Sequence, residues 1–281
     1  MANVYEIVTE QIIKKLEQGV IPWRKPWINR GNVPVNWLTQ KPYRGINTMI
    51  LDPGEYATFK QINEFGGKIK KGAAGSIVVF WKWIDKVNDE GQAERIPFLR
   101  YYKVWEINTQ VEGLNSRRKN DEVQFEHDPI EEAEKIIAGF INKPNIKYAS
   151  DRAYYSPALD FVSVPPLVDY HQPVEYYSTL FHELGHSTGH PSRLKRNTLI
   201  APAAFGSEIY SKEELVAEMS AAMLAGFAGF SEMVLDNSAA YINSWLRKLK
   251  EDSRMVVMAA SQAQKAVDHI LGNTFNGPEE C

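Results

Sequence analysis

Two histidines separated by three residues constrain this chain more than any other feature of its sequence. They belong to the run His182-Glu183-Leu184-Gly185-His186. On an α-helix, side chains four positions apart lie on the same face, so both imidazoles can reach one metal ion while Glu183 beside them accepts a proton from water. The spacing predicts a helix that carries a zinc site, with Glu183 as the catalytic base of a hydrolytic reaction.

The residues around this run predict the helix itself. Pro173 suits its first position, and Gly189 followed by Pro191 marks its end. The histidines fall outside the apolar face, which favours a ligand role over packing in the core. That face repeats at steps of three and four residues and consists of Tyr177, Leu180, Phe181, Leu184 and Thr188.

A hydrolytic zinc site needs three protein ligands and an open fourth position. His190 follows the pair too closely, and Ser192, six residues after the second histidine, cannot replace an imidazole. A second predicted helix offers Glu214 and Glu218 on one side. We favour Glu214 as the ligand, with Glu218 accepting the N–H of a ligating histidine and so fixing its ring.

A different interpretation of the same segment stays open. Ser211 followed three residues later by Glu214 fits a capping box, in which the glutamate satisfies only the backbone at the start of the helix and Glu218 binds the metal instead.

A set of ligands with two imidazoles suits Zn²⁺ over Mg²⁺, which disfavours a metal-dependent nuclease. We therefore expect Zn²⁺, with another divalent ion such as Mn²⁺ as the alternative.

The whole chain predicts a soluble, cytoplasmic protein of two domains. It has 281 residues, of which 44% are hydrophobic, enough for a full core in each domain. We find no apolar run that would span a membrane and no signal peptide, so no membrane partner is expected. Cys281 is the only cysteine, which excludes disulfides within one chain and fits a reducing compartment.

The two parts of the chain differ in charge. Residues 1–120 hold 19 Lys and Arg against 12 Asp and Glu, a balance of +7, while the remainder holds 13 against 23, a balance of −10. Six of the seven tryptophans lie in the basic part, and all six histidines lie beyond it. Aromatic rings stack on unpaired bases and basic side chains follow phosphates, so we expect single-stranded DNA as a partner of the basic part.

The candidate DNA-binding residues are aromatic, basic or amide side chains of that part. They occur in a proline-rich loop at residues 22–27, in residues 43–47, near a predicted strand over residues 77–84, and in its return strand over residues 98–107. A predicted turn at residues 88–91 joins the two strands. The candidates are Trp23, Arg24, Lys25, Trp27, Arg44, Asn47, Lys68, Lys70, Lys71, Arg100, Tyr101 and Lys103.

The pattern of elements predicts an α+β fold in two parts. Residues 1–112 form an α/β single-stranded DNA-binding domain, and residues 113–127, which are polar and charged, form a linker. Asp128 and Pro129 begin a helix. Residues 128–281 then form a mainly helical domain that carries the predicted zinc site, with a small sheet that includes residues 154–156 and 160–164.

The ordered set of motifs resembles the ArdC-type antirestriction proteins of conjugative plasmids. The resemblance is carried by residues 22–27, 43–47, 66–72, 100–105, 176–190 and 213–218. It implies an N-terminal single-stranded DNA-binding domain and a zincin-like metallopeptidase domain. It also favours Glu214 as the third ligand, because Ala217 and Ala221 match the family's pattern after that glutamate.

The resemblance further implies that the protein protects incoming plasmid DNA from host restriction. The protease substrate is not implied; an unknown protein is expected, with a component of the restriction system as one candidate. The alternative is a non-catalytic protein that coats single-stranded DNA and whose metal site is structural or idle.

Overall fold

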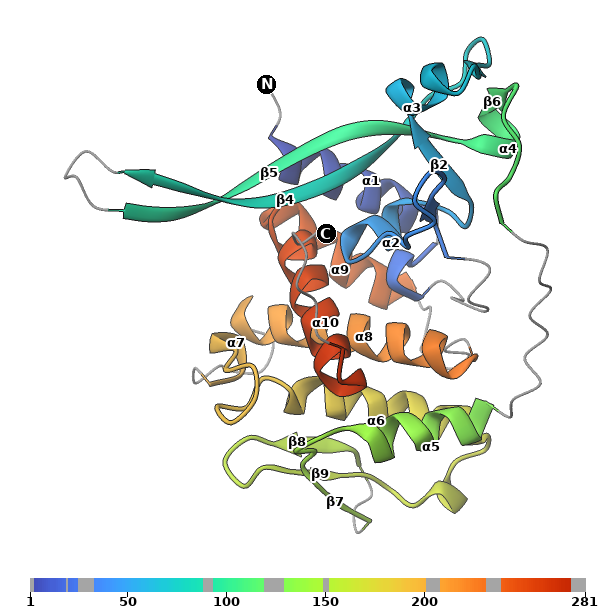
Figure 1. The fold of residues 1–281 in the computed structure, drawn as a ribbon. Helices are drawn as coiled ribbons and strands as arrows, with labels where there is room; N and C mark the ends of the chain where they lie inside the picture. Colours follow the sequence, from blue (N-terminus) through green and yellow to red (C-terminus); the bar gives the residue numbers. More distant parts are fainter. Residues whose placement is uncertain are drawn as a thin grey trace. The chain divides into compact units, whose positions relative to one another are not determined.

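The computed structural model describes residues 3–18, 20–24, 33–87, 93–118, 129–148, 152–200, 208–230 and 239–273 (Figure 1). These residues form two compact units. The first contains residues 3–12 and 33–118, and the second contains residues 13–24 and 129–273, with the gaps just given. Helix α1 (Val4–Glu17) begins in the first unit, and its last residues belong to the second.

The first unit is built on a mixed sheet of four strands in the order β1-β2-β5-β4. The pair β1–β2 is parallel, and the other pairs are antiparallel. Strands β4 and β5 pair from Ser76 opposite Val104 to Val87 opposite Ala93. Besides α1, the elements of this unit are β1 (Val35–Asn36), α2 (Ile46–Ile50), β2 (Glu55–Thr58), α3 (Phe59–Glu64), β3 (Lys68–Ile69), β4 (Ser76–Val87), β5 (Ala93–Glu106), α4 (Ile107–Gln110) and β6 (Val111–Glu112).

The segment after β6 packs onto this first unit. Leu114 joins the core around Trp37, whose indole Nε1 donates a hydrogen bond to the carbonyl oxygen of Asn115 at 2.8 Å. The guanidinium of Arg117 lies 4.1 Å from the centre of a Trp37 ring, a cation–π contact. The sequence prediction placed residues 113–118 in the linker. They are part of the first unit, because Leu114, Asn115 and Arg117 all contact the buried Trp37.

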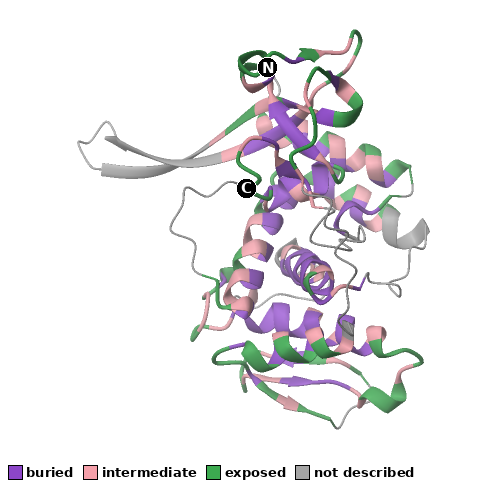
Figure 2. Cartoon of the chain, turned by 45° about the vertical axis from the view of Figure 1, so that its right-hand side comes forward, coloured by how far each residue is buried: buried purple, intermediate pink, exposed green. Residues whose placement is uncertain are grey.

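The second unit is mainly helical. Its central helix α8 is buried along most of its described length and packs against α5, α6, α7, α10 and η1 (Figure 2). The elements are η1 (Pro22–Arg24), α5 (Pro129–Gly139), β7 (Asn145–Lys147), β8 (Tyr154–Ser156), β9 (Phe161–Ser163), η2 (Leu167–Asp169), α6 (Pro173–Ser187), α7 (Asn197–Ile200), α8 (Glu208–Ala228), α9 (Ala239–Glu251) and α10 (Met255–Leu271).

Local sequence signals predicted several of these elements well. Helix α6 starts at Pro173, as the position of that proline indicated, and the predicted apolar face of the helix is buried. The expected small sheet exists as β7-β9-β8, with β8 at residues 154–156 and β9 at 161–163. The predicted strands over 77–84 and 98–107 correspond to β4 and β5, while the turn at 88–91 lies outside the described residues.

The fold is therefore mixed α+β, as expected from the sequence. Among the described residues, none of the helices combines the length and the apolar character that crossing a membrane requires.

Candidate metal centre

Helix α6 presents both histidines on one side. The Nε2 atoms of His182 and His186 lie 3.2 Å apart, and the two rings meet edge to face, with centroids 4.8 Å apart. Two ring nitrogens at this separation can share one ion. The predicted spacing of four residues thus brings the two imidazoles together.

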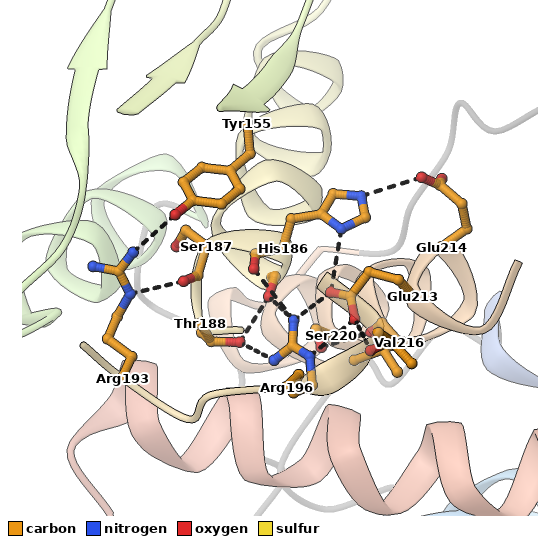
Figure 3. A network of polar contacts seen from close by, with 12 residues as sticks. Tyr155, His186, Ser187, Thr188, Arg193, Arg196, Glu213, Glu214, Val216 and Ser220 are labelled. Atoms are coloured by element: carbon orange, nitrogen blue, oxygen red, sulfur yellow. Dashed lines mark hydrogen bonds and ion pairs between the residues drawn. The ribbon is translucent and has the colours of Figure 1, made fainter. Parts of the chain in front are cut away.

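Glu214 completes the group from α8. Its carboxylate oxygens lie 3.6 Å from Nε2 of His182 and 3.4 Å from Nε2 of His186 (Figure 3 shows the contact with His186). One donor atom from each of these three residues falls within 4.8 Å of the others, and the described residues contain no second such group. Two imidazole nitrogens and one carboxylate oxygen are a donor set that suits zinc and related divalent ions.

The start of α8 decides between the two interpretations of Glu214. The helix begins at Glu208, three residues before Ser211, so Ser211 is not its N-cap residue. Ser211 is buried, and Glu214 lies in the second turn of the helix, where it has no backbone to cap. The capping-box interpretation is therefore wrong, and the carboxylate of Glu214 is directed at the histidines.

Small residues allow the two helices to approach closely enough for this contact. Gly185 of α6 crosses α8 beside Ala217 and Ser220. A Cβ atom at position 185 would lie 3.2 Å from Cβ of Ser220 and 3.3 Å from Cα of Ala217, tighter than ordinary packing. The glycine inside the histidine motif therefore sets the distance between the ligand-bearing helices.

Glu213, and not Glu218, lies beside the outer nitrogen of a predicted ligand. Its Oε1 is 3.4 Å from Nδ1 of His186. Glu218 instead accepts a hydrogen bond of 3.1 Å from Nε1 of Trp23. The sequence prediction gave the orienting role to Glu218, whereas in this structure α8 brings Glu213 to Nδ1 of His186 and directs Glu218 toward Trp23 in the 3₁₀ turn η1.

Arg196 and Thr198 hold Glu213 in place. The guanidinium of Arg196 donates to both carboxylate oxygens, with Nε 3.1 Å from Oε2, and the hydroxyl of Thr198 donates to Oε2 as well (Figure 3 shows the arginine). Arg196 and Glu213 are both buried. The sequence prediction missed this pair, since neither residue has a spacing that marks it.

His186, Glu213 and Glu214 shift one another's pKa values strongly. Burial of His186 opposes its protonation, but hydrogen bonds to Glu213 and Glu214 outweigh burial and raise the pKa of His186 to about 10. Burial alone would raise the pKa of Glu213, yet His186 and Arg196 lower it to about 2. Burial also opposes ionisation of Glu214, whose pKa the two histidines hold well below its usual range. Both carboxylates are thus ionised at neutral pH and favour a cation between the helices.

The site is open on one side. The side chains of His182 and Glu214 retain 23% and 25% of their exposure, whereas His186 retains 11%. Glu183, the predicted base, follows His182 on α6 and is buried at 8% exposure, near enough for its charge to raise the pKa of His186. A ligand in solution can therefore reach the two exposed donors.

Two predicted DNA-binding residues are buried. Trp23 is 1% exposed, and besides its bond to Glu218 it packs edge to face on Trp245 at 5.9 Å in the second unit. Asn47 is fully buried, and its side-chain amide exchanges two hydrogen bonds with the backbone of Val79, at 2.7 and 2.8 Å. Both predictions are wrong in this structure, because these side chains stabilise the fold and have no surface left for a base.

The other candidates divide between exposed and undescribed positions. Arg44 is half-buried, and the partly exposed Lys70 donates a hydrogen bond of 3.0 Å to the carbonyl oxygen of Thr109. The side chain of Arg24 and the whole of Lys25 and Trp27 lie outside the described residues. The exposed candidates are Lys68, Lys71, Arg100, Tyr101 and Lys103.

Two family models match the chain. Residues 2–105 match the N-terminal domain of anti-restriction factor ArdC, and residues 131–262 match a zincin-like metallopeptidase. Among solved structures, antirestriction ArdC from plasmid R388 is 34% identical in both its metal-free and its Mn(II)-bound form. The TM-scores are 0.73 and 0.74, with 96% and 98% of this chain and 97% and 99% of those chains covered.

Curated relatives show the same likeness. The uncharacterized protein y4eC of Sinorhizobium fredii is 33% identical, over 95% of this chain and 91% of its own length. Two DNA primases TraC of Escherichia coli are each 32% identical over 95% of this chain, which spans only 27% and 20% of their length.

The second unit thus contains a zincin-like metallopeptidase domain, a fold that implies a divalent metal. The identity of 33–34% to the R388 ArdC and to y4eC, over at least 95% of this chain, defines the family of the whole chain as well. The chain belongs to the ArdC family of antirestriction proteins.

Proposed function

We propose that this protein is a metal-dependent peptidase joined to a module for single-stranded DNA, and that it protects incoming plasmid DNA from host restriction. The peptidase half depends on one observation, the convergence of His182, His186 and Glu214 within 4.8 Å. Zn²⁺ is the ion that this donor set suits best. The Mn(II)-bound form of the R388 relative supports Mn²⁺ as the alternative.

His182, His186 and Glu214 would hold a divalent ion, which would serve as a Lewis acid toward a peptide carbonyl and toward water. Glu183, adjacent in sequence to a ligand and buried, accepts the proton of the attacking water and delivers it to the leaving amine of a peptide. Glu214 and the two histidines use one donor atom each and leave the exposed side of the site to the substrate. The substrate is an unknown protein, with a restriction-system component as one candidate.

Metal analysis of the full chain tests the ligand assignment. Glu214→Ala should lose stoichiometric zinc, since two histidines alone bind it weakly, whereas Glu218→Ala should keep it because Glu218 pairs with Trp23. Retention of zinc in Glu214→Ala, or its loss only in Glu218→Ala, would contradict the assignment.

The proposed DNA surface lies on one part of the first unit. Tyr101, Lys103 and Trp105 alternate along β5, so their side chains share one face of the strand. Phe59, which the sequence prediction missed, is 59% exposed and lies against Trp105 with centroids 6.5 Å apart. Together with Lys71 these residues combine rings and cations, which suits stacked bases and phosphates without sequence preference.

The loop that carries the lysines lies against the same tryptophan. Nε1 of Trp105 donates a hydrogen bond of 3.2 Å to the carbonyl oxygen of Ala73, and a Cβ atom at Gly75 would lie 2.7 Å from the Trp105 ring. The close fit of glycine against the indole places the loop at residues 70–75 next to the aromatic residues. We expect a single strand to follow this line of side chains.

Binding of labelled oligonucleotides tests this surface. Stacking contributes about 1–3 kcal/mol per base, so Tyr101→Ala should weaken single-strand binding about fivefold or more. Lys103→Gln should reduce the salt slope of binding by about 0.7. Lys135→Gln serves as the control, because Lys135 is exposed but pairs with Glu131 and Glu132 in the second unit. An equal loss in all three variants would contradict the proposed surface.

One substitution tests whether protection from restriction requires peptidase activity. Glu183→Gln should abolish peptidase activity while metal content and DNA affinity stay intact. If this variant protects DNA from restriction as well as the wild type does, then proteolysis is not the protective mechanism, which favours protection by coating the strand. A wild type that binds metal but cleaves no peptide would in addition mark the metal site as structural or idle.

A further inference from the structure

One arginine–glutamate pair holds His186 at both its backbone and its side chain. Nη2 of Arg196 lies 3.3 Å from the carbonyl oxygen of His186 and also donates to Oε1 of Glu213. That same Oε1 is 3.4 Å from Nδ1 of His186. The guanidinium, the carboxylate and the histidine thus form a closed ring of contacts (Figure 3).

The loop that follows α6 places the side chain of Arg196 against the end of that helix. Besides His186, the guanidinium donates to the carbonyl oxygen of Gly185 at 2.9 Å and to the hydroxyl of Thr188, so it caps the last turn of the helix. A Cβ atom at Gly189 would lie 3.0 Å from the guanidinium carbon, tighter than ordinary packing, so the glycine gives Arg196 room to lie this deep. The loop therefore directs a buried positive charge to the helix end that carries the second histidine.

Glu213 has no oxygen left to act as a metal ligand itself. Oε1 is shared by His186 and Arg196, and Oε2 accepts from Nε of Arg196 and from the hydroxyl of Thr198. A carboxylate held in this way favours the tautomer in which Nδ1 of His186 carries the hydrogen. Nε2 of His186, 3.4 Å from Oε1 of Glu214, is then the nitrogen that would give its lone pair to the proposed metal, which would take the place of a proton there.

We infer that Glu213 and Arg196 are positioning residues for the metal ligand His186: Glu213 fixes its ring and tautomer, and Arg196 fixes Glu213 and balances its charge. This inference rests on the proposed metal site. It assigns to Glu213 the role that the sequence analysis had given to Glu218.

The same loop contributes the arginine of a second arginine–carboxylate pair, Arg193 with Asp160, which serves as a control for Arg196 and Glu213. Arg193 also caps α6, donating from Nε to the carbonyl oxygen of Ser187 at 2.7 Å, and it pairs with the carboxylate of Asp160. Asp160 in turn accepts a hydrogen bond of 2.8 Å from the hydroxyl of Tyr155. This second pair supports the helix end as the first does, but it contacts no side chain of a proposed ligand.

Zinc affinity of the full chain, measured by competition with a chelator, tests the inference. Glu213→Gln should weaken Zn²⁺ binding by about 10- to 100-fold, while Asp160→Asn should change it less than about twofold, even where both lower the melting temperature. Equal affinity in Glu213→Gln and wild type overturns the inference, and so does an equal loss in both variants. Failure of the wild type itself to bind zinc identifies the proposed site, rather than Glu213, as the error.

A second measurement keeps the test informative if Glu213→Gln does not fold. Long-range ¹H–¹⁵N spectra of the zinc-loaded wild type report which nitrogen of each histidine carries a proton. We expect His186 to be protonated at Nδ1, with its Nε2 signal shifted by metal. A proton at Nε2 with metal at Nδ1 overturns the inference.

Discussion

Replacing Gly185 with alanine should weaken zinc binding at the metal centre while it destabilises the fold only modestly. The new methyl group would lie 3.2 Å from Cβ of Ser220, 3.3 Å from Cα of Ala217 and 3.4 Å from the carbonyl oxygen of Ala217. Two of these three neighbours are backbone atoms of α8, which cannot rotate away as a flexible side chain would. The contact is relieved only if α6 and α8 separate by a few tenths of an ångström.

Opposing terms determine the effect on stability. Alanine in place of glycine inside a helix stabilises it by about 1 kcal/mol, whereas overpacking a tight contact costs about 1–3 kcal/mol. The free energy of unfolding should therefore fall by about 0–2 kcal/mol. Metal ligands, in contrast, tolerate errors of only about 0.2 Å, so a separation of this size should weaken zinc binding at least about tenfold, or 1.4 kcal/mol.

Chelator competition and urea denaturation of the same samples measure the two effects. Gly139→Ala is the control, because Gly139 ends α5 and a Cβ atom there would meet nothing within 4 Å. The control should leave zinc affinity unchanged. If Gly185→Ala binds zinc as tightly as wild type, then the helix crossing does not set the ligand geometry, and the reasoning fails.

Three further substitutions test residues that are buried or partly buried in the structure. Trp23→Ala should lower the free energy of unfolding by about 3–5 kcal/mol in urea denaturation, because a fully buried indole is lost; a change below about 1 kcal/mol would contradict its burial. Asn47→Ala should lower it by about 2–4 kcal/mol, since the backbone of Val79 loses two buried hydrogen bonds, while single-strand affinity of the folded protein stays the same. Burial and the charge of Arg193 lower the pKa of His269, so its contribution is complete above about pH 6.5 and is lost as the pH falls toward the folded pKa. His269→Leu should thus reduce the drop in melting temperature between pH 7.5 and 5.5, and an unchanged drop would refute the assignment.

The sequence alone determined the local elements and the chemistry that a single helix carries. The spacing of His182 and His186 needs only the periodicity of α6, and Pro173 marks where that helix begins. The sequence likewise predicted strands over residues 77–84 and 98–107, which correspond to β4 and β5, and over residues 154–156 and 160–164, which correspond to β8 and β9. These properties follow from neighbours a few residues apart, and so they can be read from one segment at a time.

Only the tertiary structure decided which residues surround the pair of histidines. The choice of Glu214 over a capping role depends on where α8 begins, and the contact of Glu213 with His186 depends on the rotation of α8 and on a loop that brings in Arg196. Trp23 is far from these residues in sequence, yet it is bound to Glu218. Contacts between distant segments are set by how whole helices pack, and helix periodicity fixes which face packs but not which partner meets it.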